Sequence, residues 1–514
     1  VSFCLPIHLS IYLSIYLSIY VYLLFNLRDG EPPLIKGWIP YIGKALEFGK
    51  DAHKFLEEYK KKHGDIFTVL IAGKYMTFIM NPLMYPNIIK RGKQLDFHEF
   101  SNQVAPRTFG YPPVFSSKFP GMPDQIKRSF HLLQGDNLTP LSKSMMGNLL
   151  LVFKQDHLDK RQMEDSGEGG WRTDSMCEFC SKVMFEATFL TLYGKPASKR
   201  RHSSMETLRE DFIEFDKKFP LLIARIPIWL LGRTKAIREK LINYFLPQRV
   251  SCWSNTSQFI TRRVELFEQY NSLRDMDKAG SILMSFEFAH HFAILWASVG
   301  NTIPATFWAM YHLVSHPEAL EAVRQEIHSL LKLWGMDDFS DRDINLSREQ
   351  LDQLLYLESA VNESLRHSSS SMNIRVAQED FSLPLEAEQS VAVRKGDIIT
   401  LYPRSMHMDP EIYDQPEMYR YDRFVQDGRQ KTDFYKDGQR LKYYCMPFGS
   451  GATMCPGRYF AINEIKQFLF LLLLHFDLQL VEGQPKVTLD TSRAGLGILL
   501  PAKDVRFRYR LRAA

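Results

Sequence analysis

The sequence predicts one large domain that is mainly α-helical with small β-sheets. Apolar residues recur at helical spacing in residues 51–63 and almost without interruption through residues 286–331. Residues 65–80 hold two short β-rich runs around a Gly-Lys turn, and residues 391–402 read as strand, turn and strand. These patterns favour a helical core with small sheets beside it.

The most apolar predicted helix covers residues 460–476. Its central sequence, FLFLLLLHF, is shorter than the roughly 20 residues that cross a bilayer. A helix that is apolar on all sides but too short to span a membrane belongs in the core of a domain. We therefore expect this helix to be buried.

Composition excludes several classes of protein. Of the 514 residues, 45% are hydrophobic and 24% are charged, which is typical of a globular chain and not of a disordered, collagenous or multi-span membrane chain. The net charge of +5 gives no case for a nucleic-acid partner. Six scattered cysteines do not form a disulfide framework and favour a reducing compartment.

The N-terminal residues 1–29 are predicted as a hydrophobic segment and a possible membrane anchor. Residues 1–26 contain no Asp, Glu, Lys or Arg. Residues 9–20 read LSIY three times, as a CTAT repeat translated in frame would, so we expect this stretch to be an artefact of an imperfect gene model. A proline-containing link follows, and a single catalytic domain is expected over residues 30–514.

The chemistry is concentrated in the sequence FGSGATMCPGR at residues 448–458. This loop delivers Cys455 to the start of the apolar helix, with Pro456 expected at the first helical position. The free amides and dipole of a helix N-terminus stabilise a thiolate, which is a natural axial ligand of haem iron. The alternative is a buried cysteine in a glycine-rich turn.

Three neighbours of Cys455 are predicted to contact such a cofactor. Gly451 and Gly457 let the backbone approach a flat ligand closely, and Phe448 can pack on that ligand.

A second constellation lies upstream. Glu363 and Arg366 are three residues apart on one face of a predicted helix, and Arg423 follows in a Tyr-Asp-Arg-Phe sequence. A carboxylate held between two guanidiniums would lock the helix to the later loop. The alternative is an ordinary surface ion pair.

These motifs occur in the order and spacing of cytochrome P-450, and the chain resembles that family over nearly its whole length. The resemblance implies the P-450 fold, haem bound through Cys455, and a structural triad of Glu363, Arg366 and Arg423. It also implies that Arg375 pairs with a haem propionate. Because Glu363 would then be buried, glycosylation of the neighbouring sequon at Asn362 is implausible.

The sequence departs from the common family pattern in three places. Gly300 and Asn301 replace the usual acid–alcohol pair of the long helix, so Asn301 would donate a hydrogen bond or hold a water, and proton delivery would be water-led or follow a different route. Pro304 is expected to kink this helix. Thr453 stands where many relatives carry Arg or His, and residues 127–134 lack the usual Trp-x-x-x-Arg haem-binding sequence.

The departures resemble those of the sterol 7α-hydroxylase, sterol 12α-hydroxylase and prostacyclin synthase group. Residues 371–375, 446–455, 464–468 and 493–498 are most similar to the cholesterol 7α-hydroxylases. The resemblance implies 7α-hydroxylation of cholesterol with dioxygen and NADPH-derived electrons, the first step of bile acid synthesis. Oxysterol 7α-hydroxylation, sterol 12α-hydroxylation, endoperoxide isomerisation and binding without turnover stay open.

A rigid, apolar sterol requires a shaped apolar pocket. The residues expected to line it are Trp296, Ala297, Asn301, Met372 and Leu496. For each of these except Asn301, plain core packing is an equally good interpretation. Asn301 and Cys455 are the expected catalytic residues.

The chain has no Gly-x-Gly-x-x-Gly nucleotide fingerprint, so electrons are expected from NADPH–cytochrome P-450 reductase. Basic residues near the Cys455 loop could dock an acidic reductase or form a solvated basic loop; they are Arg429, Lys431, Lys436, Arg440, Lys442 and Arg458. The expected location is the endoplasmic reticulum membrane, with the catalytic domain facing the cytosol.

Overall fold

The computed structural model describes residue 14 and residues 30–39, 41–111, 121–158, 170–196, 201–250, 252–272, 279–336, 344, 346–385 and 390–512. Apart from residue 14, the segment predicted as a membrane anchor lies outside these ranges. No helix within them is long and apolar enough to cross a bilayer.

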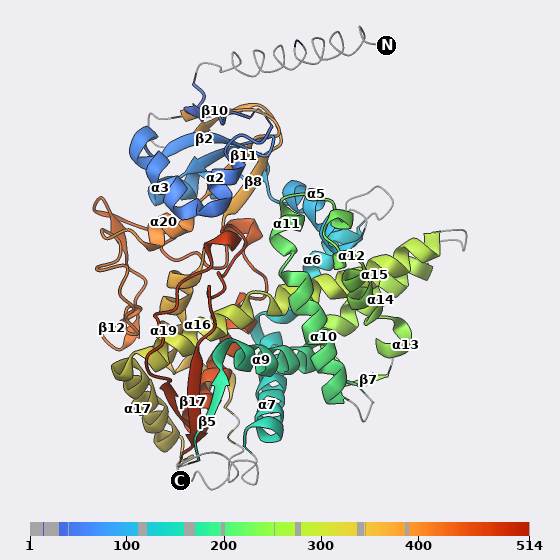
Figure 1. Cartoon of the computed structure of the whole chain (residues 1–514), viewed down its shortest axis with the longest axis vertical. Helices are drawn as coiled ribbons and strands as arrows, with labels where there is room; N and C mark the ends of the chain where they lie inside the picture. Colours follow the sequence, from blue (N-terminus) through green and yellow to red (C-terminus); the bar gives the residue numbers. More distant parts are fainter. Residues whose placement is uncertain are drawn as a thin grey trace, which may run out of the picture.

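Helices form most of the molecule, as predicted, and small sheets lie at its two ends (Figure 1). In chain order the helices are α2 (Ala45–Lys50), α3 (Ala52–His63), α4 (Tyr85–Ile89), α5 (His98–Phe109), α6 (Met122–Ser129), α7 (Leu138–Asp156), α9 (Met176–Leu192), α10 (Arg201–Asp216), α11 (Phe219–Ile223), α12 (Thr234–Asn243), α13 (Pro247–Val250), α14 (Gln258–Ser272), α15 (Ala279–Val299), α16 (Thr302–Ser315), α17 (Pro317–Leu333), α18 (Arg348–Asp352), α19 (Leu355–Ser368), α20 (Pro403–His407) and α21 (Arg458–His475).

A six-stranded sheet lies at the end of the molecule that includes α2 and α3 (Figure 1). Its order is β1 (Leu34–Ile35), β2 (Ile66–Ile71), β3 (Lys74–Ile79), β11 (Ile398–Leu401), β8 (Asn373–Ala377) and β4 (Leu95–Asp96). β2 and β3 form the predicted antiparallel hairpin, and the hydroxyls of Thr68 and Thr77 are hydrogen-bonded across it at 2.8 Å. Because β11 lies between β3 and β8, strands distant in sequence share this sheet.

A three-stranded antiparallel sheet lies at the opposite end, where the described chain ends. Its order is β16 (Phe476–Leu480), β17 (Arg506–Leu511) and β5 (Arg172–Ser175). The remaining strands form two-stranded ribbons: β6 (Lys195–Pro196) with β7 (Trp253–Ser254), β9 (Phe381–Pro384) with β10 (Ser390–Val393), β12 (Val425–Gln426) with β13 (Arg429–Gln430), and β14 (Tyr435–Lys436) with β15 (Gln439–Arg440).

Helix α21 lies at the centre of the core, as its composition predicts. It packs against α7, α16 and α19, and side chains on all of its faces are buried, including Phe468, Leu469 and Leu471. Since an apolar helix surface is stable only away from water, this packing fixes the start of α21 and the loop that precedes it.

The long central helix is divided in two, where the sequence predicts one kinked helix. α15 ends at Val299, α16 begins at Thr302, and Gly300 and Asn301 lie between them. The break lies four residues before Pro304, because a proline ring removes one amide donor and clashes with the carbonyl four positions back, here that of Gly300. The predicted distortion is present, but it places Asn301 at a helix junction.

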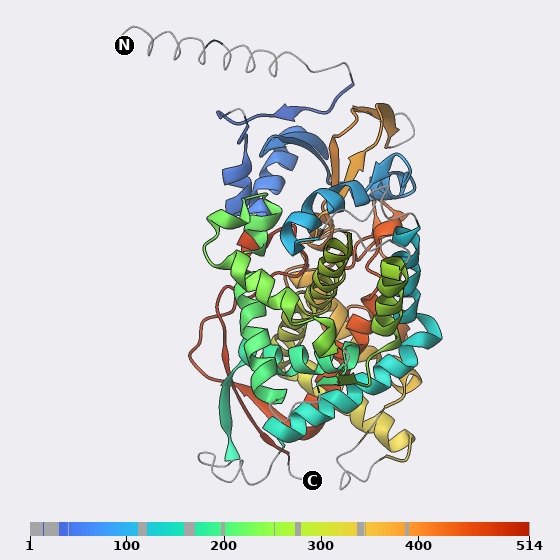
Figure 2. The same ribbon diagram turned by 90° about the vertical axis from the view of Figure 1, so that its right-hand side faces the viewer.

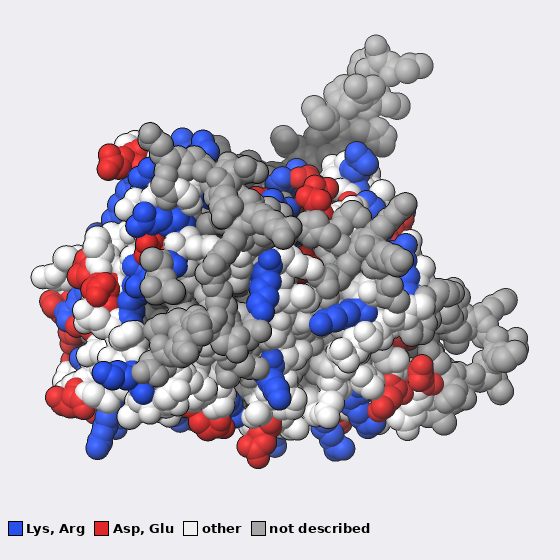
Figure 3. Space-filling view, turned by 90° about the horizontal axis from the view of Figure 1, so that it is seen from below, with Lys and Arg blue, Asp and Glu red and all other residues white. Residues whose placement is uncertain are grey.

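Charge is mixed on the face that Figure 3 shows. Among the described residues visible there, Lys and Arg side chains are interspersed with Asp and Glu. This distribution is in line with the small net charge of +5.

Candidate active site

Glu363, Arg366 and Arg423 form one buried cluster. Arg366 donates to both carboxylate oxygens of Glu363 from Nε and Nη2, each at 2.8 Å, and Arg423 Nε donates to Oε1 at 2.8 Å. Burial alone would raise the pKa of Glu363, but hydrogen bonds from Arg366 and His367 outweigh it and hold this pKa well below its usual range. The carboxylate is therefore charged and locks α19 to the later loop.

The two arginines also hold the chain that leads toward the cysteine loop. Arg366 Nη2 donates to the carbonyl of Pro416 at 2.7 Å, and Arg423 donates to the carbonyls of Asp414 at 2.7 Å and Met418 at 2.9 Å. Each guanidinium is thus satisfied by one carboxylate and by backbone carbonyls, which makes this buried ionic cluster tolerable.

His407 joins the cluster to the cysteine loop, a role that no sequence motif indicated. Its carbonyl accepts from Arg366 Nη1, and its ring Nε2 accepts from the amide of Met446 at 3.0 Å. Burial lowers the pKa of His407 to about 3, so the ring is neutral and able to accept that bond. The link passes from α19 through α20 to the loop.

The loop around Cys455 is held by its own backbone. The amide of Cys455 donates to the carbonyl of Phe448 at 2.8 Å, and Arg458 Nη1 donates to the carbonyl of Cys455 at 3.0 Å. Phe448 itself is half-buried against the core. The turn presents the thiol beside the N-terminus of α21.

Two details of the predicted loop are wrong. Pro456 is not the first helical residue, because α21 begins at Arg458 with Gly457 at its N-cap. The free thiol is also not stabilised as thiolate overall: burial raises the pKa of Cys455, while the amides of Gly457 and Arg458 and the Arg458 charge lower it less. Desolvation of the sulfur therefore outweighs the effect of the helix N-terminus on the pKa of Cys455.

The two loop glycines predicted to contact a cofactor differ in whether the fold itself requires a glycine. Gly451 has a positive φ of 59°, and a Cβ there would lie 2.5 Å from Cγ2 of Ile89. Packing against Ile89 is therefore enough to require a glycine at position 451. At Gly457 a Cβ would meet only Leu133 Cδ1, at 3.9 Å. The predicted close approach of Gly451 and Gly457 to a flat ligand stays a prediction.

Arg375 is a buried cation that no described carboxylate contacts in a salt bridge, although the charge of Asp96 is close enough to raise its pKa slightly against burial. It lies on β8 and donates to the carbonyls of Ile374 at 2.8 Å and Ser450 at 3.1 Å. Burial lowers the pKa of Arg375 to about 10. A buried guanidinium next to the cysteine loop, with no carboxylate in salt-bridge contact among the described residues, fits a haem propionate.

Three segments predicted to line the sterol pocket meet beside the α15–α16 junction. The amide of Ile498 donates to Oδ1 of Asn301 at 3.0 Å. A Cβ on Gly495 would lie 3.2 Å from Sδ of Met372, so residues 493–499, the C-terminal loop, pass directly against that side chain. Residues 296–301, 368–372 and 493–499 are therefore neighbours.

The five predicted lining residues differ in surroundings. Ala297 is exposed, so it is not packed in the core, whereas Met372 and Leu496 are half-buried against core clusters. Trp296 stacks on Phe219 with ring centroids 4.0 Å apart. The side-chain oxygen Oδ1 of Asn301 already accepts a hydrogen bond from the amide of Ile498. The group that Asn301 can offer to a substrate or water is therefore its side-chain NH2, which has no acceptor among the described residues.

Glu464 is a second buried carboxyl that the sequence analysis did not single out. It lies on α21, and its Oε2 accepts from the Thr188 hydroxyl at 3.0 Å. Burial raises the pKa of Glu464 to about 8. Its protonation at neutral pH contrasts with the charged Glu363.

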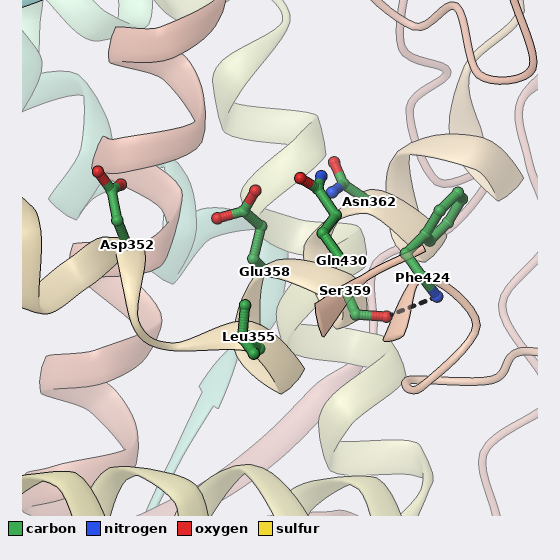
Figure 4. Close-up of a pocket in the computed structure, with 7 residues that line it drawn as sticks. All are labelled: Asp352, Leu355, Glu358, Ser359, Asn362, Phe424 and Gln430. Carbon is green, nitrogen blue, oxygen red and sulfur yellow. Dashed lines mark hydrogen bonds between the residues drawn. The ribbon is translucent and has the colours of Figure 1, made fainter. Parts of the chain in front are cut away.

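A pocket of about 220 Å³ opens between α18, α19 and the β12–β13 ribbon (Figure 4). Seven residues line it: Asp352, Leu355, Glu358, Ser359, Asn362, Phe424 and Gln430. It contains none of the five residues predicted for the sterol pocket, and its acidic side chains do not suit an apolar sterol. Asn362 is half-buried on its wall, within α19.

The fold and this cysteine site define a haem-thiolate protein, and the chain belongs to the cytochrome P450 family, which it matches over residues 32–508. This confirms the resemblance predicted from the sequence, and it implies haem iron as the cofactor. Cys455 would ligate that iron and Arg375 would hold a propionate.

Individual relatives are similar over nearly the whole chain. It is 41% identical to "Cytochrome P450 7B1" of Mus musculus (95% of this chain, 92% of the relative) and 42% identical to "Cholesterol 7-alpha-monooxygenase" of Cricetulus griseus (96% of each). It is 36% identical to "7-alpha-hydroxycholest-4-en-3-one 12-alpha-hydroxylase" of Oryctolagus cuniculus (95% of each). The chain is therefore a P450 monooxygenase whose relatives include sterol hydroxylases.

Proposed function

We propose that this protein hydroxylates cholesterol at the 7α position, using dioxygen and electrons from NADPH. The observation that carries the proposal is the placement of two features in one fold. The cysteine loop is held by the buried Glu363 cluster through His407, and residues 296–301, 368–372 and 493–499 meet beside the helix break at Asn301. The similarity to a cholesterol 7-alpha-monooxygenase supports the choice of sterol and position.

The residues divide the work as follows. Haem, when bound, supplies the iron centre that activates dioxygen, and Cys455 ligates it as thiolate. Arg375, held beside the cysteine loop by the carbonyl of Ser450, would neutralise one propionate. Trp296, Ala297, Met372 and Leu496 form apolar walls that hold the rigid sterol in one orientation.

Asn301 would organise proton delivery. Its amide can hold a water at the helix junction, while its carbonyl oxygen is fixed by Ile498. Neither Gly300 nor Asn301 is an acid, so the protons come through such a water and not from a side-chain carboxyl at these two positions.

We also propose that a separate NADPH–cytochrome P-450 reductase delivers the electrons. Part of the predicted basic surface is engaged within the protein: Lys436 pairs with Asp409 and Glu411, and Arg440 pairs with Asp433. Arg429 and Lys442 are exposed and form no ion pair with described carboxylates, so they are the better candidates for contact with an acidic partner.

We further propose that the protein works at the endoplasmic reticulum membrane with its catalytic domain facing the cytosol. The five described cysteines are free thiols, which suits a reducing compartment. Large apolar side chains are exposed near α2 and α11, including Trp38, Tyr41, Trp229 and Leu230.

The test is turnover of cholesterol by the purified full chain with reductase, with and without NADPH, and with products identified by mass spectrometry. The expected product is 7α-hydroxycholesterol, formed only with NADPH. Cys455→Ala should lose both turnover and the absorption spectrum of thiolate-ligated haem. Cys252→Ala, at an exposed cysteine, is the matched control and should retain both.

Other products would overturn parts of the proposal. Oxidation of an oxysterol only, or at the 12-position of a sterol, would keep the family and replace the substrate or position. Reaction only with a prostaglandin endoperoxide, without NADPH, would replace monooxygenation by isomerisation. Thiolate-ligated haem in Cys455→Ala would refute the assigned ligand.

A further inference from the structure

The carboxylate of Asp216 joins three segments of the chain. Asp216 is the last residue of α10, and its Oδ1 accepts from the indole Nε1 of Trp296 on α15 at 2.9 Å. Arg493, in the short helix η7 (Thr491–Arg493), donates to Oδ2 at 2.9 Å and to Oδ1 at 3.2 Å. Nη1 of Arg493 also donates to the backbone carbonyl of Asp216 at 3.1 Å.

This cluster is largely withdrawn from water. The side chains of Arg493 and Asp216 are 9% and 13% exposed, so solvent screens their attraction only weakly. Both carboxylate oxygens are occupied, one of them twice. Removing one partner of such a pair leaves the other buried and uncompensated, so the arrangement strongly favours a single geometry.

Trp296 is held on its ring face as well as at its edge. Phe219, three residues after Asp216, stacks on the indole at a centroid distance of 4.0 Å and an interplanar angle of 19°. The junction between α10 and α11 therefore fixes both the direction of the indole N–H and the plane of the ring. An aromatic wall held in this way cannot rotate to fit a misplaced ligand.

Arg493 extends the same control to the C-terminal loop. Beyond it, Gly495 donates to the carbonyl of Ser370 at 2.8 Å, and Ser370 donates to the carbonyl of Gly497 at 2.9 Å. Leu496 lies between these two anchors. Asp216 thus determines where one end of this loop lies, while Asn301 holds the other through Ile498.

We infer that Asp216 is a positioning residue that sets the regiochemistry of sterol oxidation. The inference rests on the proposed function. Cholesterol has weak allylic C–H bonds at more than one position and on both faces of the ring system, so the bond that is attacked depends on how the pocket walls orient the rings. Asp216 fixes the position of two pocket walls, the Trp296 indole and the loop that carries Leu496. It does not itself need to touch the substrate.

The experiment compares Asp216→Ala, Asp216→Asn and Trp296→Phe in the haem-loaded enzyme with reductase. The readouts are the distribution of hydroxylated cholesterol products and the apparent Kd from the sterol-induced absorption change. Asp216→Ala should raise the apparent Kd about tenfold, because the freed walls would occupy the sterol-competent arrangement only about a tenth of the time, and should divert product away from the 7α position.

The other variants separate positioning from folding. Asp216→Asn keeps an oxygen acceptor for the indole N–H and should restore product distribution toward wild type. Trp296→Phe leaves the Asp216–Arg493 pair intact but should reproduce part of the diversion. In the double variant Asp216→Ala/Trp296→Phe the two effects should not add, because both remove the same interaction.

The matched control is Glu178→Ala. Glu178, a more exposed residue on α9, forms a similar fork with Arg209 of α10, at 2.7 and 3.0 Å, and forms no hydrogen bond or ion pair with the described pocket segments. This variant should change neither product distribution nor Kd, and the thiolate-ligated spectrum reports correct folding in every variant.

The outcomes distinguish the two proposals. No sterol product from the wild type refutes the proposed function and, with it, this role. A wild type that makes 7α product, together with a folded Asp216→Ala and Trp296→Phe that give the same product distribution and Kd, refutes the positioning role alone.

Discussion

Glu363 and Glu464 are both buried, but their partners give them opposite charge states. Glu363 receives hydrogen bonds from two guanidiniums, and its pKa lies well below the usual range. Glu464 accepts a hydrogen bond from the neutral hydroxyl of Thr188, and burial raises the pKa of Glu464 to about 8. Two identical residues therefore differ because a low-dielectric site tolerates a charge only when a counter-charge is present.

The raised pKa of Glu464 predicts that the free energy of unfolding falls as the pH rises. In the unfolded chain a glutamate titrates near pH 4.3, so between about pH 4.3 and 8 the unfolded state binds fewer protons than the folded state. The contribution of Glu464 to stability is therefore fully present below that range and is lost as the pH rises through it. Glu464→Gln cannot titrate and should become progressively more stable than wild type from pH 5 to 8.

The measurement is the urea midpoint at several pH values for both proteins. Glu47→Gln, at an exposed position on α2, is the control and should follow the wild-type curve. A constant difference between Glu464→Gln and wild type across this pH range would contradict the assignment of a neutral Glu464.

The break between α15 and α16 shows how an element is shaped by its neighbours. Pro304 determines that the helix cannot continue unchanged through Gly300, and the unwound Asn301 then accepts from Ile498. The C-terminal loop is adapted to this contact, because Gly497 has a φ of 120° and a Cβ there would lie 2.2 Å from Oδ1 of Asn301. The helix junction and the loop therefore specify each other.

Asn301→Ala should destabilise this junction. The amide of Ile498 is buried and would lose its acceptor, at a cost of about 1–3 kcal/mol in the free energy of unfolding. Hydrogen exchange should accelerate in residues 493–499, while Asn362→Ala, on the wall of the polar pocket, should change little.

The double variant Asn301→Ala/Gly497→Ala sharpens that test. Gly497→Ala alone suffers both a clash with Asn301 and an unfavourable φ, and Asn301→Ala removes the clash. The double variant should therefore lose less stability than the sum of the single variants. Strict additivity would show that the two residues do not contact each other.

The whole molecule gathers exposed apolar side chains toward one end. Residues 38–39 and 41–46, which end at the start of α2, and residues 219–230, which include α11 and η5 (Ile228–Leu230), lie toward the end occupied by the six-stranded sheet (Figures 1 and 2). Single exposed apolar residues are common on proteins, but two neighbouring segments of them indicate an interaction surface.

If this surface contacts a bilayer, phosphatidylcholine vesicles should slow hydrogen exchange in residues 219–231 of the full chain. Trp229→Ser/Leu230→Ser should abolish that protection, since each large apolar side chain gains about 1.5–3 kcal/mol on leaving water. Leu333→Ser is the control, because Leu333 is also exposed but lies at the end of α17. Equal exchange with and without vesicles would contradict membrane contact.

Local sequence predicted those features that depend on neighbouring residues. The hairpin of β2 and β3, the helix α3 and the buried helix α21 follow from periodicity alone, because side chains two or about four residues apart share a face. Glu363 and Arg366 are likewise placed together by helical spacing. The link from this pair to Arg423 was a hypothesis from the Tyr-Asp-Arg-Phe sequence, and the family resemblance strengthened it.

Other features required the folded chain. The contact of Asp216 with Trp296 spans 80 residues, and its contact with Arg493 spans 277. The acceptor role of His407 depends on packing of α20 against α19. No pattern within a helix or strand reports such pairings, because each residue type alone is compatible with an ordinary surface position.

By itself, the sequence determined that this protein is a mainly helical P450 with Cys455 at the start of a buried helix. Apolar periodicity, which is a local property of the chain, predicts the helices, and the resemblance of the motifs to cytochrome P-450 supplies the family. Only the tertiary structure decided that Glu363 is charged while Glu464 is neutral, and that Asp216 holds Trp296. Those properties depend on which distant groups share a water-poor site, since burial and counter-charge exist only once the segments have packed.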